Sequence, residues 1–398
     1  MKKGKGDLES DVTIIGAGPC GCFLAYLLAK EGFRIIVVEK KRIPWLPLKC
    51  AGLISDRINE ILKVPKSIIL NRCNESVLEF PNGEKVVISG KERAFVIDRI
   101  KFDKFLFKLA KSEGATFLLG EKFERLELKR SCVIAFTRKR KITSKLLVGA
   151  DGTLSKVRKT LGLRTEKVEG FQVRARTKYK LNRVKLLFDK RIVDFFSWVI
   201  PESNNVCRVG VMCSKGSKTA LRKLLKRVKI RESEIIDYQF GFIPSFFSRR
   251  MSGERVILVG DAAAQTKAST GGGIVTGLLG SKIASKCISK SLKEGCFTSN
   301  FLKKNYDDVY YMKIGKELRK AYFLSKVLRK LSNRDLSSLS KFFSNDEILR
   351  VIGKEGDMEY YGKWLKPMFS KKAFLAISFL FLLKHPTLLK DVHLLLKP

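Results

Sequence analysis

The segment from Asp11 to Lys40 constrains the fold more than any other part of this 398-residue chain. Val12 to Ile15 form an apolar run, which is followed by the letters G-A-G-P-C-G and then by a helical apolar stripe. A second apolar run, Ile35 to Val38, ends at Glu39. This order is typical of a βαβ unit, in which a helix connects two parallel strands.

The glycine spacing inside this unit predicts a dinucleotide site. Gly16 suits the tight turn after the strand, Gly18 lets the backbone approach a pyrophosphate, and Gly21 permits close packing of helix on strand. Glu39 stands where a carboxylate binds ribose hydroxyls, and Ala17 lies in the same loop. The alternative is a glycine-rich turn without a ligand, which the complete unit of strands, helix and acid disfavours.

A second glycine-rich segment lies about 240 residues downstream. The apolar run Val256 to Val259 precedes a turn at Asp261, and three glycines, Gly271 to Gly273, precede a helix-like stretch that starts at Ile274. The carboxylate can accept hydrogen bonds from ligand hydroxyls, and a glycine-rich helix start favours negative charge. The two segments together therefore predict one anionic, hydroxylated ligand.

Four further motifs allow a family resemblance to be stated. They are L-V-G-A-D-G-T-L-S-K-V-R (Leu147 to Arg158), F-V-I-D-R-I-K-F-D (Phe95 to Asp103), K-C-A-G-L-I-S (Lys49 to Ser55) and F-S-W-V-I-P (Phe196 to Pro201). With them the chain resembles the FAD-dependent oxidoreductases related to aromatic hydroxylases. Within that superfamily it is similar to the geranylgeranyl reductase family, and to its archaeal lipid-reducing members in particular. The resemblance covers roughly residues 9 to 300.

The resemblance implies FAD as the cofactor. Asp261 is then expected near the ribityl chain, and Arg99 near the flavin nucleotide, unless Arg99 forms only a surface salt bridge with Asp103. Asp151 is expected to brace the flavin domain. The expected cofactor-binding residues are Gly16, Ala17, Gly18, Gly21, Glu39, Cys50, Ala51, Gly52, Leu53, Arg99, Phe123, Asp261, Gly272, Gly273 and Ile274.

The F-S-W-V-I-P motif is expected to line an isoprenoid cavity, which gives Phe196, Trp198, Ile200 and Pro201 as substrate-binding residues. Trp198 is flat and bulky and can fix a flexible chain. The alternative is that these side chains belong only to the core of a strand. The family usually has Tyr where this chain has Phe196, and Phe where it has Ile200, so a preference for a different chain length or headgroup is open.

Cys50 is the tentative catalytic residue. Lys49 beside it favours the thiolate form by its charge. The alternative is a small side chain that packs against the flavin and takes no part in chemistry. The family also commonly has a proline shortly before the T-G-G-G-I segment, where this chain has Ala268 and Ser269, so the rigidity of that loop is in doubt.

The predicted fold class is α/β with an α+β second domain. We expect a Rossmann-like FAD-binding domain from residues 7–72, 95–165 and 250–300, and an antiparallel-sheet substrate domain from residues 73–94 and 166–249. Residues 301–398 are expected to form a basic helical region. Its most apolar stretch, 373–383, is too short to span a membrane and either packs on the protein or lies at a membrane surface. His385 and His393 are assigned no role.

Composition narrows the partners and the location. Lys and Arg number 80 against 39 Asp and Glu, which gives a net charge of +41. Such a field attracts anionic membranes, although a general lysine bias is the alternative. Specific nucleic-acid binding is not expected because no such motif accompanies the charge. Nine scattered cysteines and two histidines predict neither disulfides nor a metal site, and we expect a cytoplasmic protein at the membrane surface.

The expected function is therefore FAD-dependent saturation of geranylgeranyl chains on archaeal-type membrane glycerophospholipids. The alternative is an FAD-dependent monooxygenase that acts on an aromatic or lipid-like substrate. A second nucleotide-binding βαβ unit is missing from the sequence pattern, so the electron donor is expected to be external: a ferredoxin, NAD(P)H or a deazaflavin.

Overall fold

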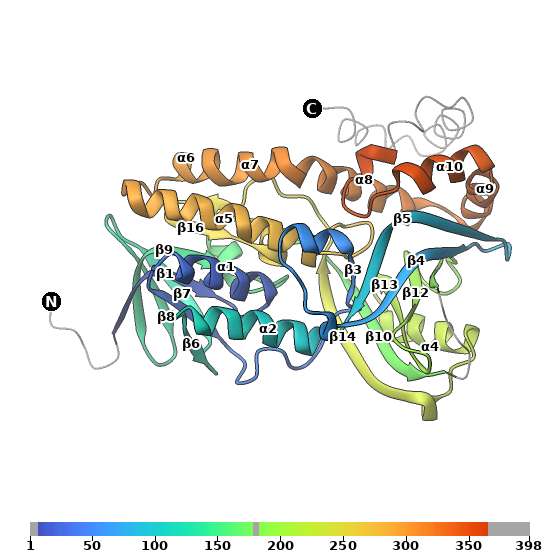
Figure 1. The fold of residues 1–398 in the computed structure, drawn as a ribbon, viewed down its shortest axis with the longest axis horizontal. Coiled ribbons are helices and arrows are strands. Elements are labelled where there is room, and N and C mark those ends of the chain that lie inside the picture. The colour runs from blue at the N-terminus through green and yellow to red at the C-terminus, as the bar shows by residue number, and fades with distance from the viewer. Residues whose placement is uncertain (1–6, 178–182, 365–398) are drawn as a thin grey trace.

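The computed structural model describes residues 7–177 and 183–364 (Figure 1). Two eight-stranded sheets stand side by side in these residues, and helices cover both of them (Figure 1). Along the chain, strands of the first sheet occur before, between and after strands of the second sheet, so the chain passes repeatedly from one sheet to the other. The predicted fold class is confirmed.

The first sheet contains the predicted βαβ unit at its centre. β1 (Leu8–Ile15) lies between β2 (Ile35–Glu39) and β9 (Lys141–Gly149) and runs parallel to both. β6 (Thr116–Leu119) and β16 (Val256–Leu258) extend the sheet in the same direction. Because these strands are parallel, their carboxyl ends meet at one edge, where ligands bind in open α/β sheets. The remaining strands pair antiparallel: β7 (Phe123–Leu128), β8 (Val133–Thr137) and β15 (Ser252–Gly253).

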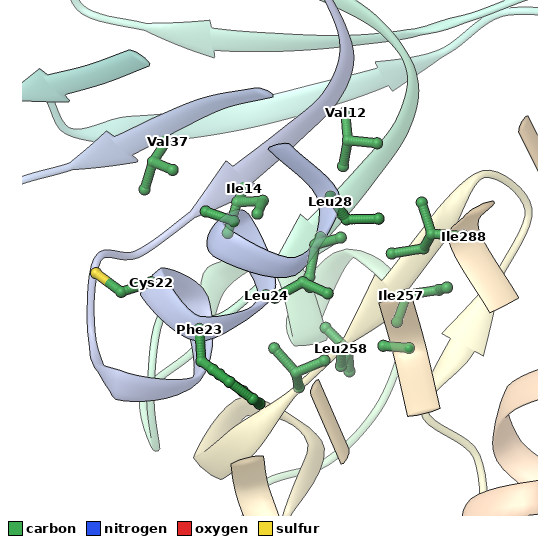
Figure 2. Close-up of a cluster of buried hydrophobic side chains, with 14 of the residues drawn as sticks. Val12, Ile14, Cys22, Phe23, Leu24, Leu28, Val37, Ile257, Leu258 and Ile288 are labelled. Carbon is green, nitrogen blue, oxygen red and sulfur yellow. The ribbon is translucent and has the colours of Figure 1, made fainter. Parts of the chain in front are cut away.

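Three long helices pack on this sheet and on one another (Figure 1). α1 (Pro19–Lys30) starts directly after the glycine turn, and α5 (Ile274–Glu294) starts at the residue predicted for it. α2 (Arg99–Ser112) and α5 both contact α1, and the short α3 (Lys156–Thr160) follows β9. Figure 2 shows the core between these elements, whose labelled apolar side chains include Val12, Ile14, Leu24, Leu28, Val37, Ile257, Leu258 and Ile288.

The second sheet supplies the other domain. β4 (Ile69–Glu79) and β5 (Lys85–Ile97) form a hairpin around the turn at Pro81. Its order is β14 (Ile235–Pro244), β10 (Lys167–Arg176), β13 (Val206–Cys213), β12 (Phe196–Pro201), β11 (Val184–Leu187), β4 (Ile69–Glu79), β5 (Lys85–Ile97) and β3 (Leu53–Ser55).

Two details of this sheet differ from the sequence prediction. β11 pairs with β4 in parallel, so the sheet is mixed rather than wholly antiparallel. β3 and the start of β4 fall within the range 7–72 predicted for the cofactor domain, but they pair into the second sheet. α4 (Ser217–Arg227) covers the outer face of β10 and β13 with a row of leucines.

The C-terminal region is helical, as predicted, in the part that is described. α6 (Ser299–Leu302), α7 (Asp308–Tyr310) and α8 (Lys316–Lys330) follow one another through two π-helical segments, Lys303–Asp307 and Tyr311–Gly315. They run along the top of the view in Figure 1 toward the second sheet.

Two further helices, α9 (Asn333–Phe343) and α10 (Asp346–Glu355), pack on β5. Within the described residues, no helix combines the length and apolar character needed to cross a membrane. The apolar stretch 373–383 and both histidines lie outside the described residues.

We predict that Asp307 makes stability depend on pH. Its buried side chain accepts hydrogen bonds from the Met251 amide (3.2 Å) and the Ser252 hydroxyl (3.0 Å), while Oδ1 has no partner. Burial raises its pKa from the ordinary 3.8 to about 6. The folded state therefore keeps this proton to a higher pH than the unfolded chain does. The unfolding free energy falls by up to about 3 kcal/mol as pH rises from about 4 to about 6.

The substitution Asp307→Asn should flatten that dependence because asparagine keeps a hydrogen-bond acceptor but carries no charge. Urea unfolding of both proteins across this pH range measures the difference. Parallel curves of unfolding free energy against pH would contradict the prediction.

Candidate functional site

A cavity of about 1400 Å³ lies between the two sheets and the C-terminal helices. Its wall includes the loop after β1, the loop before β3, the start of α5, the inner face of β10 to β14, and parts of α8 to α10. Single-ligand pockets are usually about 300–1000 Å³. The cavity is therefore large enough for more than one ligand, and it divides into a polar end and an apolar end.

The glycine loop after β1 forms the polar end. A Cβ on Gly16 (φ +108°) would overlap the Ala150 carbonyl, and a Cβ on Gly21 would overlap the Gly16 carbonyl. These two glycines thus let α1 pack directly on the strand ends. A Cβ on Gly18 would have no atom within 4 Å, because this residue faces the open cavity. The loop leaves room for a phosphate group at the start of α1.

Glu39 closes this end. One carboxylate oxygen accepts a hydrogen bond from the Ala17 amide and the other from the Lys41 amide, both at 2.9 Å. Phe123 also lines the cavity here. Ala17 and Gly21 do not line it, so any part they take in binding runs through the shape of the loop.

Asp261 lies near the N-terminus of α5, beside Gly273. Its carboxylate accepts hydrogen bonds from the Thr266 hydroxyl (2.7 Å) and the Thr153 hydroxyl (3.2 Å). Burial raises the pKa of Asp261, and these hydroxyls oppose that rise. Gly272, Gly273 and Ile274 line the cavity beside it. The N-terminus of a 21-residue helix therefore points at the polar end, where it favours negative charge.

The loop from Cys50 to Leu53 lines the cavity along its whole length. It is held by Arg208, whose side chain is 2% exposed. This guanidinium donates to the carbonyls of Ala51 and Ile97 and pairs with Glu202 at 2.7 Å. Gly52 (φ +66°) is required there because a Cβ would overlap Arg208. Arg208 was missed from the sequence, although an arginine inside the apolar strand V-C-R-V-G-V is an available signal.

Arg99 was predicted either to lie near the flavin nucleotide or to form only a surface salt bridge with Asp103. It lines the cavity, and it forms an ion pair with Asp103 at 3.0 Å. The two side chains are only 9% and 13% exposed, so the alternative of a surface salt bridge is wrong, while contact with the flavin nucleotide stays a prediction. Burial disfavours the charge on Arg99, but Asp103 and the Cys50 sulfur outweigh it and raise its pKa. Asp151, as expected, braces the fold through Ser155 and the start of α3.

Trp198, Phe196 and Ile200 line the apolar end. Pro201 does not, and its carbonyl accepts a hydrogen bond from Asn71 (3.0 Å). The Trp198 indole donates to Gln172 (3.2 Å), and a Cβ on Gly210 would overlap the indole ring. Gly210 therefore lets the ring lie flat on β13.

The indole begins a continuous row of aromatic rings that line the cavity. Ring centroids are 5.9 Å apart from Trp198 to Phe196, 6.3 Å to Phe188, 5.9 Å to Phe80 and 6.3 Å to Phe343. The last three were missed from the sequence because they belong to three distant segments without a motif. Side chains from the C-terminal helices complete the wall: Phe323, Leu324, Val327, Leu328, Leu336, Leu339, Phe342 and Ile352.

The loop that lacks the family's proline is fixed by side chains instead. Lys267 pairs with Glu359 at 2.9 Å and donates to the Met358 carbonyl at 2.8 Å. The hydroxyls of Ser269 and Tyr361 lie 2.9 Å apart. This ion pair and these hydrogen bonds attach the loop to the C-terminal region and restrain it where a proline would otherwise stiffen the turn.

The cysteines and acids add no further centre. All nine cysteines are free. Within residues 7–177 and 183–364, His, Cys, Asp and Glu side chains form no group of three that could hold a metal ion.

A family model described as FAD binding domain matches residues 9–217, which contain the glycine loop, Glu39 and the Cys50 loop. The chain belongs to the FAD-binding domain family. Its cofactor is FAD, and the protein is an FAD-dependent oxidoreductase.

Three known proteins illustrate the similarity. A digeranylgeranylglycerophospholipid reductase 2 of Methanopyrus kandleri is 26% identical and covers 87% of this chain and 94% of its own length. A geranylgeranyl bacteriochlorophyll reductase-like protein of Thermoplasma acidophilum has the same fold, with a TM-score of 0.80 at 21% identity over 92% of this chain and 100% of its own. A p-nitrophenol 4-monooxygenase of Pseudomonas putida aligns with a TM-score of 0.67 at 18% identity, covering 87% and 97%.

The polar end fits FAD. The open space at Gly18 and the N-termini of α1 and α5 suit a pyrophosphate. The carboxylates of Glu39 and Asp261 line the cavity and can accept hydrogen bonds from hydroxyl groups. The loop at Cys50 and the glycines before α5 both line the cavity, so their backbone groups can contact a ligand that lies between them. FAD bound there would supply redox chemistry next to the apolar end.

We predict that Gln172 fixes the orientation of Trp198. Its amide accepts from the indole and donates to the Gln239 side chain at 2.6 Å. The substitution Gln172→Leu leaves the indole N–H of Trp198 and the side-chain oxygen of Gln239 buried without these hydrogen bonds, so it should cost about 1–3 kcal/mol of unfolding free energy. Urea unfolding measures the loss. The exposed Arg176 on the same strand offers a control, since Arg176→Leu should change stability little; equal losses would contradict the prediction.

Proposed function

We propose that the protein saturates the double bonds of geranylgeranyl chains on archaeal-type membrane glycerophospholipids. The observation that carries the proposal is the continuity of the cavity, in which the FAD site opens directly onto the row of aromatic rings. The printed names of the reductases that the chain resembles support the same substrate class.

The dimensions of the apolar end suit a lipid tail. A tail occupies half of a hydrocarbon core about 30 Å thick, which is roughly 15 Å. The four ring-to-ring steps from Trp198 to Phe343 are each about 6 Å. A whole tail can therefore lie along the row, with the part near Trp198 closest to the cofactor site.

The chain's own residues have two tasks in this reaction. They exclude water, because leucine and phenylalanine side chains of α8 and α9 cover the apolar end. They also orient the chain, because Trp198 is held flat by Gly210 and Gln172. An isolated double bond must receive a proton and a hydride, and reduced FAD supplies the hydride. Phe196 carries no hydroxyl, so it orients by shape alone.

Cys50 is proposed to contact the cofactor and take part in catalysis. The Gly52 amide donates to its sulfur at 3.3 Å, and Arg99 lies beside it. The electron donor is proposed to be external and is a ferredoxin, NAD(P)H or a deazaflavin.

A monooxygenase acting on an aromatic or lipid-like substrate is the second candidate, and the shared fold of the p-nitrophenol 4-monooxygenase favours it. The two candidates are separated by one experiment. The purified FAD-loaded protein is reduced anaerobically, mixed with a geranylgeranylated glycerophospholipid and analysed by mass spectrometry. We expect a gain of two hydrogens per saturated bond. Oxygen in the product after air is admitted would instead support the monooxygenase.

We predict that Trp198→Ala slows this turnover by about 100-fold, because a poorly oriented chain seldom presents its double bond correctly. FAD content should stay unchanged, since Trp198 belongs to the apolar end. Phe240, exposed on β14 and absent from the cavity wall, provides a matched control, and Phe240→Ala should retain full activity. A Trp198→Ala variant as active as the control would contradict this role.

We also propose that the protein binds anionic membrane surfaces through its basic charge and the tail 371–398. Removal of residues 371–398 should weaken binding to vesicles that contain an anionic phospholipid and leave FAD content intact. Cosedimentation with vesicles measures the effect, and neutral vesicles are the control. Unchanged binding would remove the tail from this role.

A further inference from the structure

The ion pair of Lys267 and Glu359 lies in the wall of the cavity. The two side chains are 5% and 4% exposed, and the Lys267 Nζ is 2.9 Å from Glu359 Oε1. A buried ion pair loses the hydration of both charges, which only good hydrogen bonding offsets. Lys267 has the Met358 carbonyl as a second acceptor at 2.8 Å.

Glu359 is less well satisfied. Its Oε2 atom is buried and has no hydrogen-bond partner. The other buried acids that line the described cavity, Glu39, Glu121 and Asp357, have partners on both carboxylate oxygens. An unpaired buried oxygen costs free energy, so its persistence in this wall points to a ligand or a proton as its partner.

The pair stands beside the cofactor site. A Cβ placed on Gly272 would be 2.9 Å from the Lys267 Cε and 3.3 Å from its Nζ. Gly272 belongs to the glycine segment that precedes α5 and lines the polar end. Glu359 is therefore near the junction of the two ends, where a double bond must lie to react.

From this arrangement we propose that Glu359 is the catalytic acid that protonates the double bond, with Lys267 as its proton reserve. The inference rests on the proposed function and assigns the proton source for that reaction. In this proposal Lys267 and Glu359 share one proton across their 2.9 Å contact. A lipid tail that fills the cavity removes water, and a dry site favours the neutral pair of amine and carboxylic acid.

The step balances in atoms and charge. The carboxylic acid of Glu359 gives its proton to one alkene carbon, and the other carbon receives the hydride that reduced FAD supplies. The π bond is lost and two C–H bonds form. Glu359 is left as a carboxylate beside the neutral amine of Lys267, which regains a proton from water after the product leaves. Two electrons from the external donor, together with a proton from water, would restore reduced FAD.

The test uses Glu359→Gln in the FAD-loaded protein. Glutamine keeps an acceptor for Lys267 but cannot carry the proton. FAD content and affinity for the lipid should be unchanged, while single-turnover oxidation of the reduced protein by a geranylgeranylated glycerophospholipid should slow by at least about 100-fold. Glu359→Asp should recover part of the rate. Lys363→Gln breaks an ion pair of similar length with Asp357 in the same segment and should react at the wild-type rate.

An infrared measurement separates this role from a structural one. A saturated lipid of the same headgroup, which fills the cavity but cannot react, should induce a carboxylic-acid band in the wild-type protein that Glu359→Gln lacks. Absence of the band, or a Glu359→Gln protein that reacts at the wild-type rate, would overturn the proposal. A wild-type protein that shows the band but never oxidises with the unsaturated lipid would overturn the proposed function instead.

Discussion

Direct contact between α1 and the strand ends determines where the rest of the molecule lies. Gly16 and Gly21 remove the side chains that would hold the helix away from β1 and β9. With α1 in place, the carboxyl ends of the parallel strands and the starts of α1 and α5 converge on one point. The polar end of the cavity follows from that convergence, because backbone amides and helix dipoles then face the same space. The second sheet needs only to cover it.

The sequence was sufficient for this half of the molecule because its constraints are local. A turn that requires glycine, a strand end that requires an acid and a helix that starts at Ile274 each depend on neighbours within a few residues. The predicted residues from Gly16 to Ile274 that line the cavity are brought together from distant segments of the chain, although their contacts with FAD stay predictions.

The apolar half could not be predicted in the same way. Phe80, Phe188 and Phe343 form one row only after three distant segments fold together, and a lone phenylalanine in each gives no sign of it. The cross-link of Lys267 to Glu359 has the same character, since neither residue belongs to a pattern. The parallel pairing of β11 with β4 was missed because strand direction depends on the route of the chain between strands. Only Arg208, charged within an apolar strand, left a local signal.

The contact between Arg57 and Asp357 joins residues 300 positions apart, at distances of 3.2 and 2.7 Å. Asp357 lies two residues from Glu359 and lines the same cavity. During synthesis the ribosome therefore releases the βαβ unit and the second sheet before the part of the cavity wall that α8 to α10 supply. Until then the rings of Trp198, Phe196, Phe188 and Phe80 lack the cover of those helices. Closure of such long loops carries an entropic cost and slows folding. The newly made protein therefore passes through a stage in which the apolar end of the cavity is exposed, and exposed apolar surface promotes aggregation.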